Sequence, residues 1–267
     1  RDFEVPAMHP QMAHAARPVR VGPAMVHQVD HWTHILRVNQ LALAAAVESG
    51  LKGWSDAHAV RRAWSLASLL WKAGGWREDR ILRSLSQIHP DAKVHPTAVV
   101  EVSSIGPGVE LGPMSVVKSS VLGAGVRVEE HATVVMSTLG EGSHVGRYGM
   151  VNLCTAWPGA RISHGDGFQG CVFGRDSFVA WGATILDLSF GREVQVLEGG
   201  AWTSSGHHFL GAAIGHEACV GNGVRINHGM EIPNGVTLVA DADSVLRRWP
   251  EACAGGGRFR VRGGEPE

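Results

Sequence analysis

Two adjacent histidines, His207 and His208, lie near the end of a glycine- and serine-rich stretch that reads GGAWTSSGHHFLG. Imidazole titrates near neutral pH, so either side chain could act as a general base toward a hydroxyl or an amine. Successive side chains of an extended segment point in opposite directions, which predicts that only one of the two does so. The alternative interpretation is a surface loop that happens to carry two of the 15 histidines of the chain.

Three further polar residues are candidates for substrate binding: His164, Asp166 and His228. Asp166 stands in the segment ISHGDG, at a position of a repeating pattern where a small residue is usual. A local break in a strict pattern can mark a site. It can equally mark a row widened to accept the bulky Phe168, which follows two residues later, and this second interpretation is favoured.

The element that must position these residues is a repeat that runs from Ile88 to about Asp243 with a period of 17 residues. Within each row a mostly apolar anchor recurs after six, six and five residues, as in Ile105, Leu111 and Val117. Such spacing predicts triangular coils, each made of three short strands, which stack into a solenoid. A column of small residues precedes one set of anchors by two positions, and it consists of Ser103, Ser120, Ser137, Cys154 and Cys171.

The segments IGPGVELGPMSV, LGEGSHVG and IGHEACVGNGVRINHGMEIPNGV resemble the left-handed parallel β-helix of the hexapeptide-repeat superfamily. The 17-residue rows look most like the C-terminal domains of sugar-nucleotide pyrophosphorylases, whose catalytic domain has no counterpart in this chain. The superfamily's other large branch contains CoA-dependent acyltransferases. The resemblance to that branch implies acetyl-CoA or another acyl-CoA as co-substrate, a homotrimer, and sites in grooves between its subunits.

The register of the repeat changes once, after the expected anchors Phe190 and Val196. The next clear anchor, Ile214, comes seven residues later than the period predicts, so an insertion is expected to project over about 197–210. From Ile214 onward the spacing is that of an 18-residue coil. Because the superfamily's sites lie where loops reach across a groove, this insertion is the first place to look for catalysis.

The predicted fold class is mainly β: a left-handed parallel β-helix over residues 88–243, preceded by a small α-helical region over residues 30–87. Asp30 is a plausible N-cap of a first helix with Gly50 as its stop, and Ser55 a plausible cap of a second helix that ends at Gly74. A third, short helix is expected over about 78–85. Residues 1–29 are predicted to form an extended arm with one strand at 19–21, and residues 244–267 a cap and a flexible tail.

Composition excludes several classes of function. The 24 basic and 25 acidic side chains leave no electrostatic footprint for nucleic acid. The most apolar run, Leu41 to Val47, is far shorter than the roughly 20 residues that cross a bilayer. Four cysteines without a CxxC pair favour a cytoplasmic protein, in which Cys154 and Cys171 fill the small-residue column; a disulfide between these two is the less favoured alternative. His216 and His228 belong to different faces of one coil, so no metal site is predicted.

The leading hypothesis is a hexapeptide-class acyltransferase that acts on a small acceptor, a sugar or a nucleotide sugar, with His207 or His208 as the base. The alternative is a non-catalytic β-helix scaffold that oligomerises and docks a protein partner through its tryptophan-rich N-terminal helices. Five of the nine tryptophans lie between residues 32 and 76.

Overall fold

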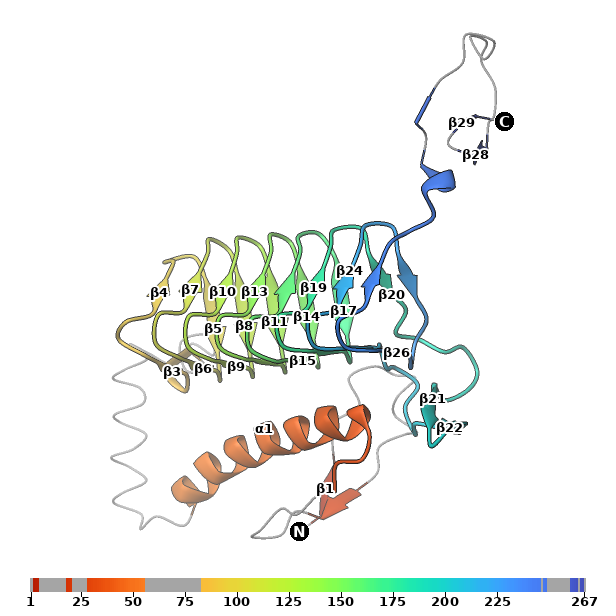
Figure 1. Ribbon diagram of the computed structural model, residues 1–267. Coiled ribbons are helices and arrows are strands. Elements are labelled where there is room, and N and C mark those ends of the chain that lie inside the picture. Colours follow the sequence, from red (N-terminus) through yellow and green to blue (C-terminus); the bar gives the residue numbers. More distant parts are fainter. Residues whose placement is uncertain are drawn as a thin grey trace.

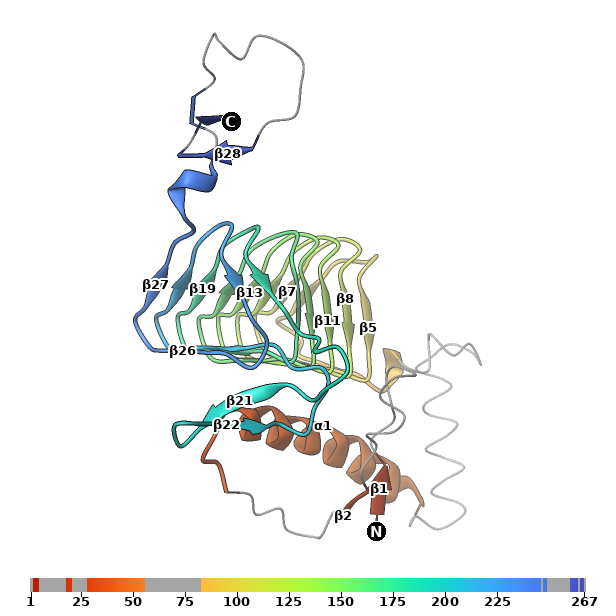
Figure 2. The same cartoon turned by 90° about the vertical axis from the view of Figure 1, so that its right-hand side faces the viewer.

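The computed structural model describes residues 2–4, 18–20, 28–55, 83–245, 247–248, 260–263 and 265–266. Its centre is a solenoid in which the short strands of successive coils stack in parallel along one axis (Figure 1 and Figure 2). The long helix α1 (Trp32–Ser55) lies along one side of this solenoid (Figure 1). The predicted fold class, a left-handed parallel β-helix preceded by an α-helical segment, is confirmed.

The solenoid has three faces, to which each complete coil contributes one strand. The first face is a sheet of eight strands, β3 (Gln87–Ile88), β6 (Ser104–Ile105), β9 (Val121–Leu122), β12 (Thr138–Leu139), β15 (Thr155–Ala156), β18 (Val172–Phe173), β23 (Ala213–Ile214) and β26 (Glu231–Ile232). The second face also has eight, β4 (Lys93–Val94), β7 (Glu110–Leu111), β10 (Arg127–Val128), β13 (His144–Val145), β16 (Arg161–Ile162), β19 (Phe178–Val179), β24 (Cys219–Val220) and β27 (Thr237–Leu238). The third face holds a sheet of five strands and a separate pair, β5 (Val99–Glu101), β8 (Val116–Lys118), β11 (Thr133–Val135), β14 (Met150–Asn152) and β17 (Gly167–Gln169), then β20 (Thr184–Ile185) and β25 (Arg225–Ile226).

The predicted anchors point inward and form the core of the solenoid. Val128 is paired with Leu111 on one side and with Val145 on the other, each 17 positions away. All three side chains are at most 2% exposed, and burying an aliphatic side chain of this size contributes about 1.5–3 kcal/mol. The predicted anchor Ile88 is an exception at 37% exposure, because its strand is the outermost of the first face.

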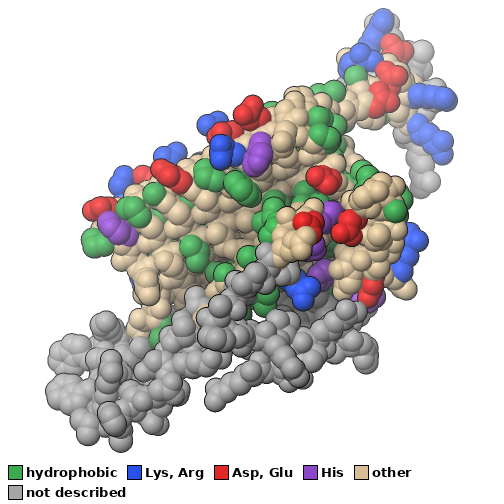
Figure 3. All heavy atoms as spheres, turned by 60° about the horizontal axis from the view of Figure 1, so that its bottom comes forward, with side chains coloured by type: hydrophobic (Ala, Val, Ile, Leu, Met, Phe, Trp, Pro, Cys, Tyr) green, Lys and Arg blue, Asp and Glu red, His purple; other side chains and the backbone are tan. Residues whose placement is uncertain are grey.

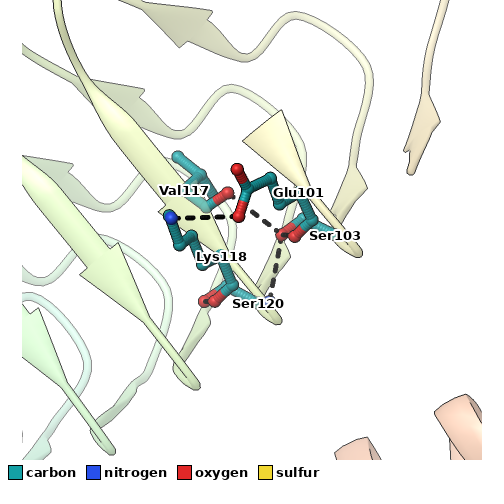
Figure 4. Close-up of polar contacts among 5 residues, drawn as sticks. All are labelled: Glu101, Ser103, Val117, Lys118 and Ser120. Atoms are coloured by element: carbon teal, nitrogen blue, oxygen red, sulfur yellow. Dashed lines mark hydrogen bonds and ion pairs between the residues drawn. The ribbon is translucent and has the colours of Figure 1, made fainter. Parts of the chain in front are cut away.

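Hydrogen bonds explain the column of small residues at the corner between the third and first faces. The amide of Ser120 donates to the Oγ of Ser103 at 3.2 Å, and the amide of Ser137 donates to the Oγ of Ser120 at 3.1 Å. The Ser103 hydroxyl donates to the carbonyl of Glu101 at 2.7 Å (Figure 4). Each serine thus satisfies a backbone amide of the next coil and a carbonyl of its own, which a longer side chain could not do.

Cysteines continue this column in the later coils, and we call its chain of hydrogen bonds the ladder. The amide of Cys154 donates to the Oγ of Ser137 at 3.0 Å, and the amide of Cys171 donates to the Sγ of Cys154 at 3.3 Å. Both thiols are free, so the less favoured disulfide does not form. Burial raises the pKa of the Cys171 thiol well above its usual range, so this residue is a structural member of the corner rather than a nucleophile.

The helix α1 begins two residues after the predicted cap Asp30 and continues beyond its predicted stop. Gly50 lies inside the helix rather than ending it, and Ser55, expected to cap a second helix, is the last residue of the first. A glycine inside a helix costs about 1 kcal/mol relative to alanine, which other interactions of the helix can offset. The second predicted helix and most of the third lie outside the described residues.

The first half of α1 packs on the first face of the solenoid. Trp32 and Leu36 are 7% and 4% exposed and share a cluster with Val172 and Ala213 of strands β18 and β23. The hydroxyl of Thr138 in β12 donates to the side-chain carbonyl of Asn39 at 2.7 Å. An apolar face of the helix therefore covers one side of the β-helix.

The insertion is larger than predicted. Phe173 pairs with Ile214, which lies 41 positions later, although one coil needs only 17. Phe190, expected as an anchor, is 87% exposed, and Val196 is buried against α1 instead of in the coil core. The surplus is therefore 24 residues rather than seven, because the segment expected to form a seventh circuit contributes no strand to any face.

The insertion folds as a β-hairpin of β21 (Gln195–Glu198) and β22 (Ala201–Ser204), which are antiparallel. Gly199 and Gly200 form its two-residue turn with φ of 58° and 85°, a backbone conformation in which glycine is strongly preferred. As predicted, the hairpin projects from the solenoid, and it lies beside α1 (Figure 2).

Short elements flank these parts. Strands β1 (Asp2–Glu4) and β2 (Pro18–Arg20) pair antiparallel, and β2 matches the strand expected at 19–21 to within one residue. After β27 come the 3₁₀ helix η2 (Ala242–Ser244) and the antiparallel pair β28 (Val261–Arg262) and β29 (Glu265–Pro266). Within the described residues no helix combines the length and the apolar character that crossing a membrane requires.

Candidate functional site

A small polar cleft lies where the start of α1 meets the hairpin. Its volume is about 100 Å³. Most of its lining side chains are basic or carry hydroxyls, and the full set is His31, Thr33, His34, Arg37, Val196, Glu198, Ser204, Ser205 and His207. Figure 3 looks toward the side of the solenoid on which α1 and the hairpin lie, where histidine, basic and acidic side chains gather.

The helix side of the cleft is held by hydrogen bonds in the first turn of α1. The Nδ1 of His31 accepts the amide of Thr33 at 3.4 Å and lies 2.9 Å from the Thr33 hydroxyl oxygen. The Nδ1 of His34 accepts the amide of Asp30 at 3.3 Å. Because an acceptor Nδ1 carries no proton, both neutral rings carry theirs on Nε2.

The hairpin side of the cleft is held by the serines that precede His207. The amide of His207 donates to the Oγ of Ser205 at 3.2 Å, and the Ser205 hydroxyl lies 3.4 Å from the carbonyl of His207. The Ser204 hydroxyl donates to the carboxylate of Glu193 in a short contact. These local bonds fix the backbone from which the His207 ring projects.

The structure separates the two candidate bases. His207 lines the cleft, whereas the Nδ1 of His208 lies 3.2 Å from the carbonyl of Arg192 on the outgoing arm of the insertion. One of the two histidines therefore lies in the cleft and the other lies outside it.

His164 and Asp166 lie elsewhere, at the corner between the second and third faces. The ring of His164 stacks on Trp181 of the next coil with 5.5 Å between centroids. The Oδ2 of Asp166 accepts the amide of Gly182 at 2.9 Å. Partial burial raises the pKa of Asp166, and the hydrogen bond from Gly182 acts against this rise. Both residues thus bind the next coil of the solenoid, and neither lines the cleft with His207.

His228 lies near the root of the insertion but does not line the cleft. The amide of its neighbour Gly229 donates to the carbonyl of Gly211, and a side chain at Gly229 would collide with the carbonyl of Gln195. The Nδ1 of His228 is buried without a hydrogen-bond partner in the described part of the chain. Of the five predicted site residues, only His207 lies in the cleft.

The other residues that line the cleft were not predicted as site residues, among them His31, His34 and Arg37. Their spacing of three contains a signal, because residues three apart on a helix are neighbours. Nothing local in the sequence indicates that the insertion folds back against the first turn of α1.

A second hollow of about 670 Å³ lies on the second face but is wide and shallow. Its charges already pair with one another: Lys93 Nζ lies 2.9 Å from Glu110 Oε1, and Arg127 Nε lies 3.1 Å from Glu110 Oε2. The hydrogen bond from Lys93 and the two positive charges lower the pKa of Glu110. Because these charges neutralise each other, this hollow is a weaker candidate for a functional site than the cleft.

Among the described residues no group of three or more histidine, cysteine, aspartate or glutamate side chains could hold a metal ion. This includes the cleft, where histidines from two elements come together. The donor set there is suited to hydrogen bonding and proton transfer.

Comparison with known proteins supports the assignment of the coils to a solenoid. The family model described as the GMPPB C-terminal domain matches residues 83–196, which contain the coils up to β20 and the start of the hairpin. This bears out the resemblance to sugar-nucleotide pyrophosphorylase C-terminal domains. A search of curated proteins found no match.

One similar solved structure is a mutant GDP-perosamine N-acetyltransferase from Caulobacter crescentus in complex with CoA and GDP-perosamine. It is 19% identical over 57% of this chain and 51% of that chain, with a TM-score of 0.25. The chain thus spans about half the length of that enzyme, and a likeness this distant says nothing about activity.

Proposed function

Because the coils of this chain belong to the hexapeptide-repeat superfamily, we propose that the protein is an acyltransferase. It moves an acyl group from acetyl-CoA or another acyl-CoA to a small acceptor, a sugar or a nucleotide sugar. The cleft between α1 and the hairpin is the proposed site, and His207 is the proposed general base. The observation that carries this proposal is that His207 shares the cleft with His31, His34 and Arg37.

The proposed chemistry needs one base and a positioned acceptor. The hydroxyl or amine of the acceptor attacks the carbonyl carbon of the thioester while His207 takes its proton. The tetrahedral intermediate then collapses, the C–S bond breaks, and the leaving thiolate of CoA takes up the proton. His207 is suited to this role because its backbone is fixed by Ser205 and its side chain is exposed to an incoming ligand.

The size of the cleft limits what it can hold. Small-molecule pockets usually have roughly 300–1,000 Å³, and this cleft has about 100 Å³. It therefore holds one group of the acceptor, while the acyl-CoA lies along the open side. In the homotrimer that the resemblance implies, the projecting hairpin would be the loop that reaches the groove between subunits.

A non-catalytic scaffold is the second candidate. It is favoured by the match to a C-terminal domain rather than to a catalytic domain. It is also favoured by the second face, whose wide hollow is lined by charges that already pair. In this interpretation the coils oligomerise and the N-terminal helices dock a protein partner.

A turnover assay separates the two candidates. Acyl-CoA thioesters of different chain length are mixed with the protein and with sugar or nucleotide-sugar acceptors, and free thiol is measured against time. A calorimetric titration with acetyl-CoA runs in parallel. An acyltransferase gives acceptor-dependent thiol release and saturable binding, whereas a scaffold gives neither.

A further inference from the structure

We propose that the cleft between α1 and the hairpin binds a phosphoryl group, with the Nε2–H of His31 and the guanidinium of Arg37 as its main donors. This inference rests on the proposed function for the role of the site, and it narrows the acceptor to a molecule that carries a phosphate or diphosphate. Binding of the anion itself requires no acyl transfer, so it can be tested alone.

His31 has a hydrogen-bond donor without a partner in the described part of the chain. Hydrogen bonding of the His31 Nδ1 to Thr33 leaves the ring proton on Nε2. This Nε2 is buried and has no hydrogen-bond partner within the described residues. A buried donor without a partner is costly, and it is satisfied when an acceptor enters the site.

Arg37 supplies a positive charge to the cleft. Arg37 lines the cleft, is exposed, and makes no ion pair or hydrogen bond with the described part of the chain. A guanidinium presents a planar fork of N–H donors that matches the oxygens of a phosphate. Glu198 is the one carboxylate among the lining residues, and its Oε2 accepts the hydroxyl of Thr203 at 3.3 Å.

The size of the cleft suits a phosphoryl group. A volume of about 100 Å³ equals that of roughly three water molecules in the liquid. That is the scale of a phosphoryl group and far below that of a nucleotide or a sugar. Since α1 starts at this cleft, the partial positive charge of its N-terminus adds to the attraction for an anion.

The test is a calorimetric titration of the full chain with inorganic phosphate and with pyrophosphate. Wild-type protein is expected to bind at millimolar or lower concentration. His31→Leu and Arg37→Gln each remove one donor, and each is expected to weaken binding roughly tenfold or more. His31→Gln keeps an N–H near the position of Nε2 and is expected to stay within about threefold of wild type.

Arg161→Gln is the matched control, because Arg161 is also an exposed cation but lies on β16 in the second face. It is expected to leave phosphate binding unchanged. Competition with CoA and with a nucleoside diphosphate then tells which substrate brings the phosphate, and displacement by either supports the site. Thermal melts of each variant check that it is folded, and Arg37→Met, which keeps the aliphatic stem without the charge, replaces Arg37→Gln if that variant is not.

Two results would overturn the inference: no phosphate binding by wild type, or binding by His31→Leu and Arg37→Gln equal to that of Arg161→Gln. Acyl transfer that persists in either case leaves the proposed function standing. Conversely, phosphate binding that depends on His31 and Arg37 in a protein without turnover supports the anion site and removes the acyltransferase.

Discussion

The Oγ of Ser103 lies 3.2 Å from the amide nitrogen of Ser120, one coil further along the solenoid. The same contact joins Ser120 to Ser137 at 3.1 Å. At this corner a serine side-chain oxygen, instead of a backbone carbonyl, thus accepts the backbone amide of the next coil. The small-residue column is a chain of hydrogen bonds as well as a steric requirement.

We predict that Ser120→Ala destabilises the protein by about 1–3 kcal/mol, because it leaves the buried amide of Ser137 without its acceptor. Ser120→Cys should recover part of this loss, since Cys154 fills the same role in the ladder. Urea unfolding gives the free energies. Ser163→Ala, at a half-exposed position of the same solenoid, is the control, and a loss equal to that of Ser120→Ala would contradict the ladder.

Val128→Asp is expected to destabilise severely, because the new carboxylate would be buried among the anchors without a partner. Val128 is 1% exposed. The same substitution at Val99, which is 39% exposed on β5, changes the charge equally but should cost far less. Circular dichroism melts compare the two, and similar midpoints would show that Val128 does not face the core.

The anchors could be predicted because a solenoid repeats one short-range rule. Phe168 and Ile185 follow their predecessors by 17 residues, and both are buried. Phe190 obeys the same spacing, yet it is exposed. The rule failed there because an apolar residue in phase does not reveal whether the chain is still in the coil. That depends on Val196 joining the buried cluster that contains Leu36, which lies about 160 positions earlier.

His207→Ala is expected to lower acyl transfer by roughly 10²–10⁴-fold, which is the usual contribution of a general base. His208→Ala should have little effect, because His208 does not line the cleft and contacts Arg192 instead. Thiol release with saturating acyl-CoA measures both. Equal activity of the two variants and of wild type would place the chemistry elsewhere, with His164, Asp166 and His228 as the next residues to test.

The raised pKa of Asp166 predicts that the stability of the protein depends on pH. Its pKa in the folded protein is raised above the ordinary value of 3.8, so the folded state binds the proton more tightly than the unfolded chain. Its contribution to stability is therefore greatest below about pH 3.8 and is lost as the pH rises through the folded pKa. Asp166→Asn, which keeps an acceptor for Gly182, removes this loss.

The measurement is the difference in unfolding free energy between Asp166→Asn and wild type at about pH 3.5 and about pH 7. The variant should gain relative to wild type at the higher pH. Asp166→Ala is the control, because it leaves the amide of Gly182 without its acceptor and should lose stability at both values. A difference for Asp166→Asn that does not change with pH would contradict the raised pKa.

We predict that the chain forms a homotrimer, because flat solenoid faces offer large surfaces and cyclic symmetry is common in oligomers. Exposed apolar side chains occur on the coils, among them Tyr148, Met150 and Trp181. Multi-angle light scattering should give about three times the chain mass of 28.4 kDa. A particle of single-chain mass at micromolar concentration would remove the groove between subunits and with it the proposed setting of the hairpin.

The candidate site was only partly foreseeable. His207 was predicted because it lies in an insertion, and loops that project from a regular scaffold often carry catalytic and binding residues. His31 and Arg37 were not, because nothing local in the sequence brings residue 31 to residue 207. Their meeting depends on long-range packing of α1 and the hairpin around Leu36, Val194 and Leu210.

The packing of α1 on the first face also restricts how copies of this chain can associate. A triangular rod has three sides, and here the rod's own helix occupies one of them over β15 and β18. A neighbouring rod on that side would meet α1 and the hairpin instead of the strands, whereas the edge between the other two sides exposes Tyr148 and Trp181. The helix thus acts as a built-in spacer that breaks the equivalence of the sides and gives any bundle of these rods a defined inside and outside.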